Sequence, residues 1–137
     1  MVDKLTPEER SINMGKIRSR NTSPEMKVRK IAHGLGYRFR LYRRDLPGKP
    51  DLVFTARKKV IFVHGCFWHQ HKDPKCKISR IPKSKLDYWI PKLQNNVDRD
   101  MQHQAELKKL GWKNLVVWEC EVKNIERLRR KIGNFLS

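Results

Sequence analysis

Residues 51–54 (DLVF) and 60–63 (VIFV) are two short apolar runs separated by the basic turn at residues 56–59 (ARKK). Runs of this length that are rich in branched and aromatic side chains and bounded by turn residues are typical of buried β-strands. The preceding residues 46–50 (LPGKP) have the glycine and prolines of a turn. We therefore predict two adjacent strands in the core of the fold.

The sequence before these strands has helical signals. Capping residues predict one helix from Thr6 to about Ser19 and another that begins at Ser23 and runs up to Gly34 and Gly36. The first has few branched apolar residues, so we interpret residues 1–20 as an arm that contacts a partner. Residues 37–41 (YRFRL) alternate in polarity, as a half-buried strand does.

The sequence after the two strands returns to a helical period. An apolar stripe from about residue 85, interrupted near Pro91, predicts a helix that ends at Gly111. Residues 115–118 (LVVW) predict a further strand, and the spacing of apolar residues over 125–132 predicts a closing helix. This order of elements indicates the α/β class, with a mixed central β-sheet flanked by helices.

Length and charge narrow the class of partner. A chain of 137 residues fits a single domain over residues 1–137. Lys and Arg number 32 against 14 Asp and Glu, which gives a net charge of +18. Such an imbalance favours a polyanionic partner: DNA, RNA or an anionic membrane. The basic residues are spread along the whole chain, which favours nucleic acid over a membrane-lying helix.

Targeting and membrane signals are missing from the sequence. No apolar run approaches the ~20 residues of a membrane helix, and residues 1–5 lack the apolar stretch of a secretory signal. We expect a cytoplasmic protein without membrane contact, and a monomer.

The three cysteines, Cys66, Cys76 and Cys120, favour a metal site. An odd number of cysteines in a cytosolic protein argues against a disulfide framework. Residues 65–85 form a long segment without a clear helical or strand period. A loop of this length in a small domain is usually functional or is fixed by an additional contact. The spacing lets the loop wrap a zinc ion through Cys66, His71 and Cys76, with Cys120 as fourth ligand. His69 competes with His71 as the nitrogen ligand, and packing of inert thiols is the alternative.

A second group combines oxygen and imidazole. Asp51 lies at the start of one predicted strand and His64 at the end of the next, so the two side chains can meet. A carboxylate near phosphate is tolerated mainly by binding a divalent cation such as magnesium. His69 can take a proton from an attacking water, because histidine is the side chain that most often serves as a general base. Taken alone, a carboxylate at the position of Asp51 caps a turn as often as it binds a metal. A lone histidine such as His64 is more often a hydrogen-bonded core residue than a catalytic one.

Aromatic side chains concentrate near this loop. Phe67 and Trp68 are adjacent in a polar segment, and residues 88–89 (YW) open the predicted helix. Such side chains can stack on bases or insert between base steps. Packing in the core is the alternative role for these aromatic side chains. We expect it for Trp112 and Trp118, and it is an alternative for Trp89 too.

Four segments resemble the signature of the very short patch repair (Vsr) family of DNA mismatch endonucleases. They are residues 47–51 (PGKPD), 62–69 (FVHGCFWH), 96–100 (NVDRD) and 111–120 (GWKNLVVWEC). Residues 18–22 (RSRNT) resemble the family too, and the likeness runs from about Arg10 to Cys120. The resemblance implies the type II restriction endonuclease fold and cleavage of one DNA strand at T:G mismatches made by deamination of 5-methylcytosine. It also implies a bacterial protein that associates with the nucleoid through DNA.

The resemblance further implies roles for single residues. Asp51 and the backbone carbonyl of Val63 would bind Mg²⁺, His69 would be the general base, and His64 and Glu25 would support the catalytic site. The implied structural Zn²⁺ ligands are Cys66, His71, Cys76 and Cys120. The implied DNA-inserting side chains are Phe67, Trp68 and Trp89 from one groove and Met14 from the other.

Two departures and two rival functions accompany this resemblance. Val63 stands where the family often has Thr, and the second strand carries Phe62 and His64 where the wider nuclease superfamily has an acid and a Lys. One rival is a Vsr-like nuclease of a restriction or defence system without mismatch specificity. The other is a zinc-stapled DNA-binding module without catalysis, which Asp51, His64 and His69 together disfavour. Mismatch-repair proteins are possible partners.

Overall fold

The computed structural model describes residues 22–137, and its centre is a four-stranded sheet. The strands are β1 (Arg40–Leu41), β2 (Leu52–Phe54), β3 (Lys59–His64) and β4 (Lys113–Trp118), in the order β1-β2-β3-β4. β1 and β2 pair antiparallel, as do β2 and β3, whereas β3 and β4 are parallel. The predicted mixed sheet of the α/β class is therefore confirmed.

The two apolar runs of the sequence form the central strands β2 and β3, as predicted. A short 3₁₀ turn at Thr55–Arg57 joins them, and Lys58 closes it in the left-handed region at φ 52°. Alternate side chains of each strand face opposite sides of the sheet. Leu52, Phe54 and Ile61 belong to one apolar cluster, whereas Val53, Val60 and Phe62 belong to another.

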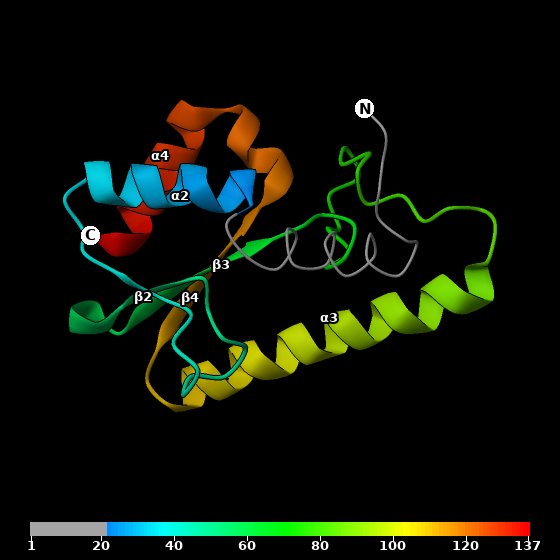
Figure 1. Ribbon diagram of the computed structural model, residues 1–137, viewed down its shortest axis with the longest axis horizontal. Helices are drawn as coiled ribbons and strands as arrows, with labels where there is room; N and C mark the ends of the chain where they lie inside the picture. The colour runs from blue at the N-terminus through cyan, green and yellow to red at the C-terminus, as the bar shows by residue number, and fades with distance from the viewer. Residues whose placement is uncertain (1–21) are drawn as a thin grey trace, which may run out of the picture.

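Helices cover both faces of the sheet (Figure 1). α2 (Ser23–Gly34) and α4 (Ile125–Leu136) lie together on one face, and Val28 and Ile132 are fully buried against that side of the sheet. The long helix α3 (Leu86–Lys109) crosses the other face. Its Leu107 packs with Val53, Val60 and Phe62. Both faces of the central strands are thereby removed from water, which explains their almost continuous apolar sequence.

Three details of the sequence prediction were wrong. Only Arg40–Leu41 of residues 37–41 form a strand. α3 runs without interruption through Pro91, because proline falls in its second turn, where exposed Asp87 leaves the freed carbonyl open to water. The apolar stripe predicted for α3 included Met101 and Leu107 and matches its buried side only in part, since Leu107 is buried and Met101 is 64% exposed.

The connection from β3 through α3 to β4 positions the functional groups. Parallel pairing sets His64 opposite Trp118, so both strands finish at the same edge of the sheet. The long loop of residues 65–85 leaves this edge from β3, and the 3₁₀ helix η2 (Glu119–Lys123) leaves it from β4. Side chains just beyond His64 and Trp118 must therefore lie near one another.

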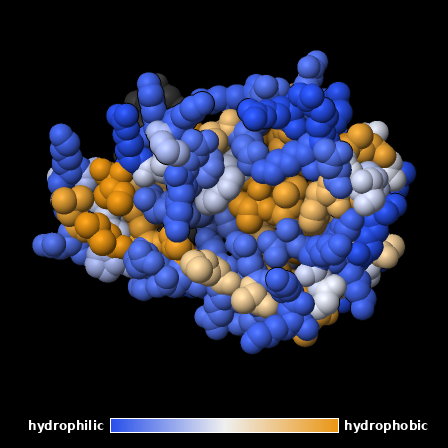
Figure 2. All heavy atoms as spheres, turned by 180° about the vertical axis from the view of Figure 1, so that it is seen from behind, coloured by the Kyte–Doolittle hydropathy of each residue, from blue (hydrophilic) through white to orange (hydrophobic). Residues whose placement is uncertain are grey.

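The described part of the chain contains no helix long and apolar enough to cross a membrane. Its surface is mainly hydrophilic, with separate hydrophobic patches (Figure 2). One patch lies at the end of the molecule where α3 begins, at the left of that view, and Leu86, Tyr88 and Ile90 are exposed there. The predicted arm over residues 1–20, with Met14, lies outside the described residues.

We predict that Gly48 is required by the turn that leads to β2. Its φ is 77°, and a Cβ atom there would lie 3.0 Å from both His103 Cβ and Phe62 Cε1. Gly48→Ala is expected to destabilise the fold by about 1–3 kcal/mol, since it adds backbone strain and a clash. Gly34→Ala is the control, because a Cβ at the end of α2 meets nothing within 4 Å. Thermal melts of both variants test this, and an unchanged melting temperature for Gly48→Ala would contradict it.

Candidate functional site

A cavity of about 230 Å³ opens at the strand edge, and all four sequence-predicted catalytic residues line it. Asp51 is the residue just before β2, and His64 is the last residue of β3. Glu25 comes from the first turn of α2, and His69 from the loop after β3. Segments far apart in the sequence thus converge on one pocket at the edge of the sheet.

Asp51 is fixed at the floor of this pocket by the neighbouring strand. Its Oδ2 accepts a hydrogen bond of 2.6 Å from the backbone N–H of Val63. Burial raises the pKa of Asp51 from 3.8 to about 7, against the lowering effect of that hydrogen bond, and the charge of Glu25 raises it further. A divalent cation would favour the ionised carboxylate, so this environment suits a metal ligand.

His64 is a neutral, buried member of the pocket. Burial lowers its pKa from 6.5 to about 3, and the neighbouring His69 lowers it further. The two imidazoles stack with ring centroids 3.9 Å apart and planes 7° from parallel. His64 therefore stays uncharged at ordinary pH and acts as a support for the His69 ring.

His69 is oriented by a carboxylate that the sequence reasoning did not single out. Its Nδ1 lies 2.6 Å from Oδ2 of Asp100, on α3. A proton on Nδ1 that is donated to Asp100 leaves Nε2 as the basic nitrogen. The pair can thus accept a proton from a water in the pocket. The only signal in the sequence was that Asp100 lies in the segment 96–100 quoted above, where no role was given to it.

Glu25 is buried at the pocket wall and held by two further side chains. Its Oε2 accepts hydrogen bonds from the Tyr42 hydroxyl at 2.7 Å and from Arg29 Nη2 at 3.1 Å. Sequence reasoning assigned neither residue to the site. The Arg29 contact is an i, i+4 pair within α2, a spacing that the sequence does show. The approach of Tyr42 depends on the packing of α2 against the segment between β1 and β2, which a local pattern does not show.

A second group, of soft ligands, lies beside the first. The candidate ligand atoms of Cys66, His71, Cys76 and Cys120 all lie within 4.8 Å of one another. His71 Nδ1 is 3.8 Å from Cys66 Sγ and 3.4 Å from Cys120 Sγ. A tetrahedral zinc ion sets S···N edges of about 3.5 Å, so the arrangement fits such an ion. His69 lies with His64 and Asp100 instead.

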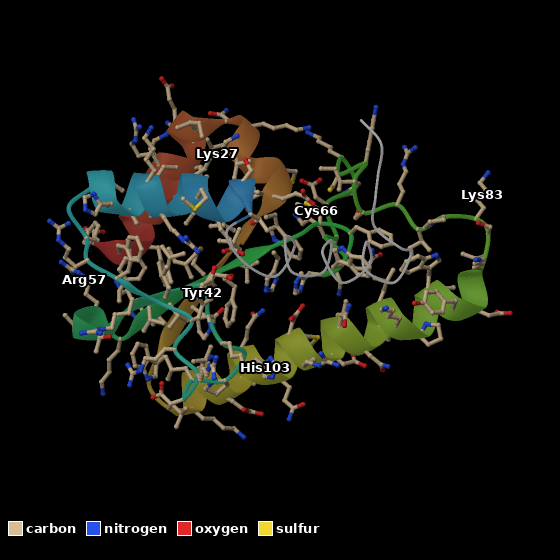
Figure 3. All side chains as sticks on the ribbon, viewed as in Figure 1. Lys27, Tyr42, Arg57, Cys66, Lys83 and His103 are labelled. Atoms are coloured by element: carbon tan, nitrogen blue, oxygen red, sulfur yellow. The ribbon has the colours of Figure 1, made fainter. Side chains whose placement is uncertain are left out.

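The chemistry of the three thiols also fits a cation. Burial raises the pKa of both Cys66 and Cys120. At Cys76, burial is outweighed by hydrogen bonds, first that with His71, and its pKa falls to about 7. A metal would bind all three as thiolates and so stabilise the folded loop. The cluster is part of the loop's structure, since Cys66 N–H also donates to Glu119 Oε1 at 3.0 Å. Figure 3 shows Cys66 where β3 gives way to the loop.

The candidate DNA-inserting aromatics form one cluster between the loop and the start of α3. The ring centroid of Phe67 lies 5.2 Å from that of Trp68 and 5.3 Å from that of Trp89. Trp68 and Trp89 are 5.9 Å apart. Lys92 lies 5.6 Å above the Trp68 ring, and Asn96 donates to the Trp68 carbonyl. The apolar surroundings of Trp68 therefore come from α3, through Trp89, as well as from its neighbour Phe67 in the loop.

Trp112 and Trp118 differ in their environments. Trp112 is partly buried and packs against the apolar cluster on the α3 side of the sheet, as expected. Trp118 instead stacks on His71 at 4.3 Å and contacts the edge of His64 at 5.3 Å. Trp118 therefore separates the Cys/His cluster from the catalytic pocket.

Comparisons with known proteins agree with this arrangement. The family model described as DNA mismatch endonuclease Vsr matches residues 2–75. The type II nicking enzyme V.XorIIP of Xanthomonas oryzae pv. oryzae is 50% identical over 137 residues, which cover 100% of this chain and 98% of that protein. The DNA mismatch endonuclease Vsr of Escherichia coli is 38% identical over 93% of this chain and 80% of its own length.

The chain belongs to the Vsr endonuclease family. A further relative, the type II nicking enzyme V.NmeAIP of Neisseria meningitidis, is 42% identical over 99% of this chain and 95% of that protein. Membership of the Vsr family makes the chain a nuclease, and the predicted family resemblance is confirmed.

We predict a pH dependence of stability that arises from Asp51. Because its pKa in the folded protein is about 7 instead of 3.8, the folded state binds more protons than the unfolded state between these values. Stability then falls as pH rises through this window. Asp51→Asn removes the effect, so in buffer without divalent cations the variant should gain stability relative to wild type from about pH 4 to pH 8.

Melting temperatures of wild type and Asp51→Asn across this range measure the effect. Asp45→Asn is the control, because Asp45 is exposed and paired with Arg43. A difference between wild type and Asp51→Asn that stays constant with pH, or changes in the opposite direction, would contradict the assignment.

Proposed function

We propose that this Vsr-family nuclease nicks one strand of double-stranded DNA at T:G mismatches, in a Mg²⁺-dependent reaction that begins very short patch repair. The observation that carries the proposal is the joint position of Asp51, Glu25 and the His69–Asp100 pair in one pocket. The likeness to the Escherichia coli mismatch endonuclease supports the choice of substrate. The type II restriction endonuclease fold, a single domain and a monomeric state remain predictions.

The pocket residues divide the hydrolysis between them. Asp51 and the Val63 carbonyl would hold Mg²⁺, which supplies stabilisation of the charge that develops on the phosphate. His69 takes a proton from the attacking water through Nε2, and Asp100 holds the ring in the required tautomer. The water oxygen bonds to phosphorus, the bridging oxygen leaves, and one phosphodiester bond is broken. His64 and Glu25 support the geometry from the buried wall.

The Cys/His cluster would hold structural Zn²⁺. Cys66, His71, Cys76 and Cys120 provide four ligands of the type that closes a structural zinc site, with no position left for substrate. The cluster ties the loop after β3 to the end of β4. A fixed loop keeps both His69 and Trp68 in place, so zinc would contribute to activity through structure alone.

DNA recognition would use the aromatic cluster and the basic surface. Phe67, Trp68 and Trp89 would insert near the mismatch, where unstacking a base step costs least. Met14 would enter from the other groove, as the family resemblance implies. The net charge of +18 supports contact with many phosphates.

A second candidate function is a Vsr-like nuclease without mismatch specificity. Its support is that two relatives at 50% and 42% identity are named type II nicking enzymes. Both candidates predict the same pocket chemistry and differ only in the duplex that is cut. Mismatch-repair proteins as partners belong to the first candidate.

A nicking assay separates these functions. Supercoiled plasmid and defined T:G and T:A duplexes in varied sequence contexts are incubated with the protein and magnesium. We expect nicking of one strand at T:G, no nicking by Asp51→Ala, and unchanged or tighter DNA binding by that variant, since it loses a metal ligand and a repulsive charge. Asp45→Ala controls for charge and should nick normally. Equal cutting of T:G and T:A supports the second candidate, and absence of cutting by wild type contradicts both.

We predict that zinc is required for the fold. Cys120→Ala should lower the melting temperature and release zinc, because an incomplete tetrahedral site loses metal affinity and the folding free energy that goes with it. Metal analysis of the purified protein measures the ratio of zinc to chain. His69→Ala should lose nicking and keep its zinc, so zinc loss in that variant would reverse the assignment of the two histidines. Wild type without stoichiometric zinc would contradict the site.

We predict that Trp68 selects mismatched DNA. Trp68→Ala should reduce the preference for T:G over T:A duplexes, with a stability loss well below the about 3–5 kcal/mol typical of a buried Trp. Trp112→Ala is the matched control, because Trp112 packs against the core. It should destabilise the fold and keep the preference per folded molecule. Melting curves and nicking rates for both variants distinguish insertion into DNA from core packing. A large stability loss with full selectivity for Trp68→Ala would exclude insertion of Trp68 between base steps.

A further inference from the structure

Glu25 is bound by a triangle of hydrogen bonds that lies behind the catalytic pocket. Arg29 Nη2 donates to the Tyr42 hydroxyl at 2.6 Å, and that hydroxyl donates to Glu25 Oε2 at 2.7 Å. Arg29 Nη2 also lies 3.1 Å from the same carboxylate oxygen. Both donors therefore fix the same oxygen of Glu25, Oε2.

The backbone of Tyr42 is held in an unusual conformation. Its φ is 52°, in the left-handed region that aromatic residues rarely adopt. The side chain is half-buried, and the Arg29 guanidinium lies 5.6 Å from the ring centroid. Figure 3 shows Tyr42 in the middle of the molecule, between the layer that contains α2 and the layer that contains α3. Strain of this kind persists where surrounding contacts demand it, and it is concentrated at functional sites.

The triangle also places a positive charge near the carboxylates of the pocket, which repel one another. Three carboxylates line the same small cavity, and Glu25 and Asp51 are the two that are not paired with His69. The charge of Glu25 adds to burial in opposing ionisation of Asp51, whereas the charge of Arg29 favours it. Arg29 is nearly buried, with 13% of its side chain exposed. Its charge is therefore little screened by water and acts on both carboxylates.

We propose that Tyr42 and Arg29 are positioning residues that hold the Glu25 carboxylate in one orientation at the wall of the catalytic pocket. The hydroxyl of Tyr42 is the central element, because it joins the guanidinium to the carboxylate. The proposal rests on the proposed function, in which this pocket hydrolyses a phosphodiester bond. Tyr42 is not among the residues that line the pocket, and it acts through Glu25.

Tyr42→Phe tests the proposal, because it removes both hydrogen bonds of the hydroxyl and keeps the ring under Arg29. We expect kcat for nicking to fall about tenfold, with KM for the duplex unchanged within about twofold. Tyr37→Phe is the matched control. It makes the same chemical change at a ring that packs on the core and against Arg57, away from the pocket, and kcat should not change.

A double-mutant cycle with Glu25→Gln shows whether the effect passes through Glu25. In the Glu25→Gln background, Tyr42→Phe should change kcat less than about twofold, because the carboxylate that it positions is gone. An equal fall in both backgrounds, or a Tyr42→Phe variant with the wild-type kcat, would overturn the proposal. A fall in melting temperature with kcat retained per folded molecule would make the triangle purely structural and would overturn it too.

The same cycle measured by thermal unfolding keeps this result separate from the proposed function. Coupling between Tyr42 and Glu25 in the melting data reports the hydrogen bond itself, whatever duplex the protein cuts. Wild type that nicks no duplex contradicts the proposed function. In that case, absence of coupling in the melting data overturns the triangle as well, whereas coupling there supports the contact on which it depends.

Discussion

Both groups of functional side chains depend on the parallel pairing of β3 with β4. This pairing sets His64 opposite Trp118, so Cys66 and Cys120, each two residues beyond the end of its strand, lie at the same edge of the sheet. The catalytic pocket forms at this same edge, because Val63 N–H anchors Asp51 there. A shift of one residue between the strands would reverse the faces of their side chains and separate both groups.

The catalytic pocket places acids in a protein whose partner is a polyanion. A net charge of +18 attracts DNA, yet Asp51 and Glu25 repel the phosphate that they face. Burial adds a second cost, because it opposes ionisation of Asp51 and raises the pKa of this carboxyl group to about 7. A divalent cation relieves both costs at once, because it neutralises the carboxylates and attracts the phosphate. Under the proposed function, the pocket would therefore work with a bound divalent cation.

The parts of the structure that local pattern determines could be predicted from the sequence. The apolar runs at residues 51–54 and 60–63 predicted the central strands, and the spacing of soft ligands from Cys66 predicted the metal cluster. Asp100 and Tyr42 could not be placed, because their contacts depend on how α3 and the segment after β1 pack across the sheet. The contact between Trp68 and Trp89 could not be predicted for the same reason, since Trp89 lies 21 residues along the chain on α3. Long-range packing decided these environments, and no local period records it.

We propose that one edge of the sheet holds two metals of different kinds, separated by Trp118. Anomalous diffraction from crystals of the whole chain, soaked in manganese as a probe for magnesium, locates both. We expect a zinc signal among Cys66, His71, Cys76 and Cys120 and a separate manganese signal at Asp51. Zinc found between His69 and Asp100, or manganese bound away from Asp51, would contradict it.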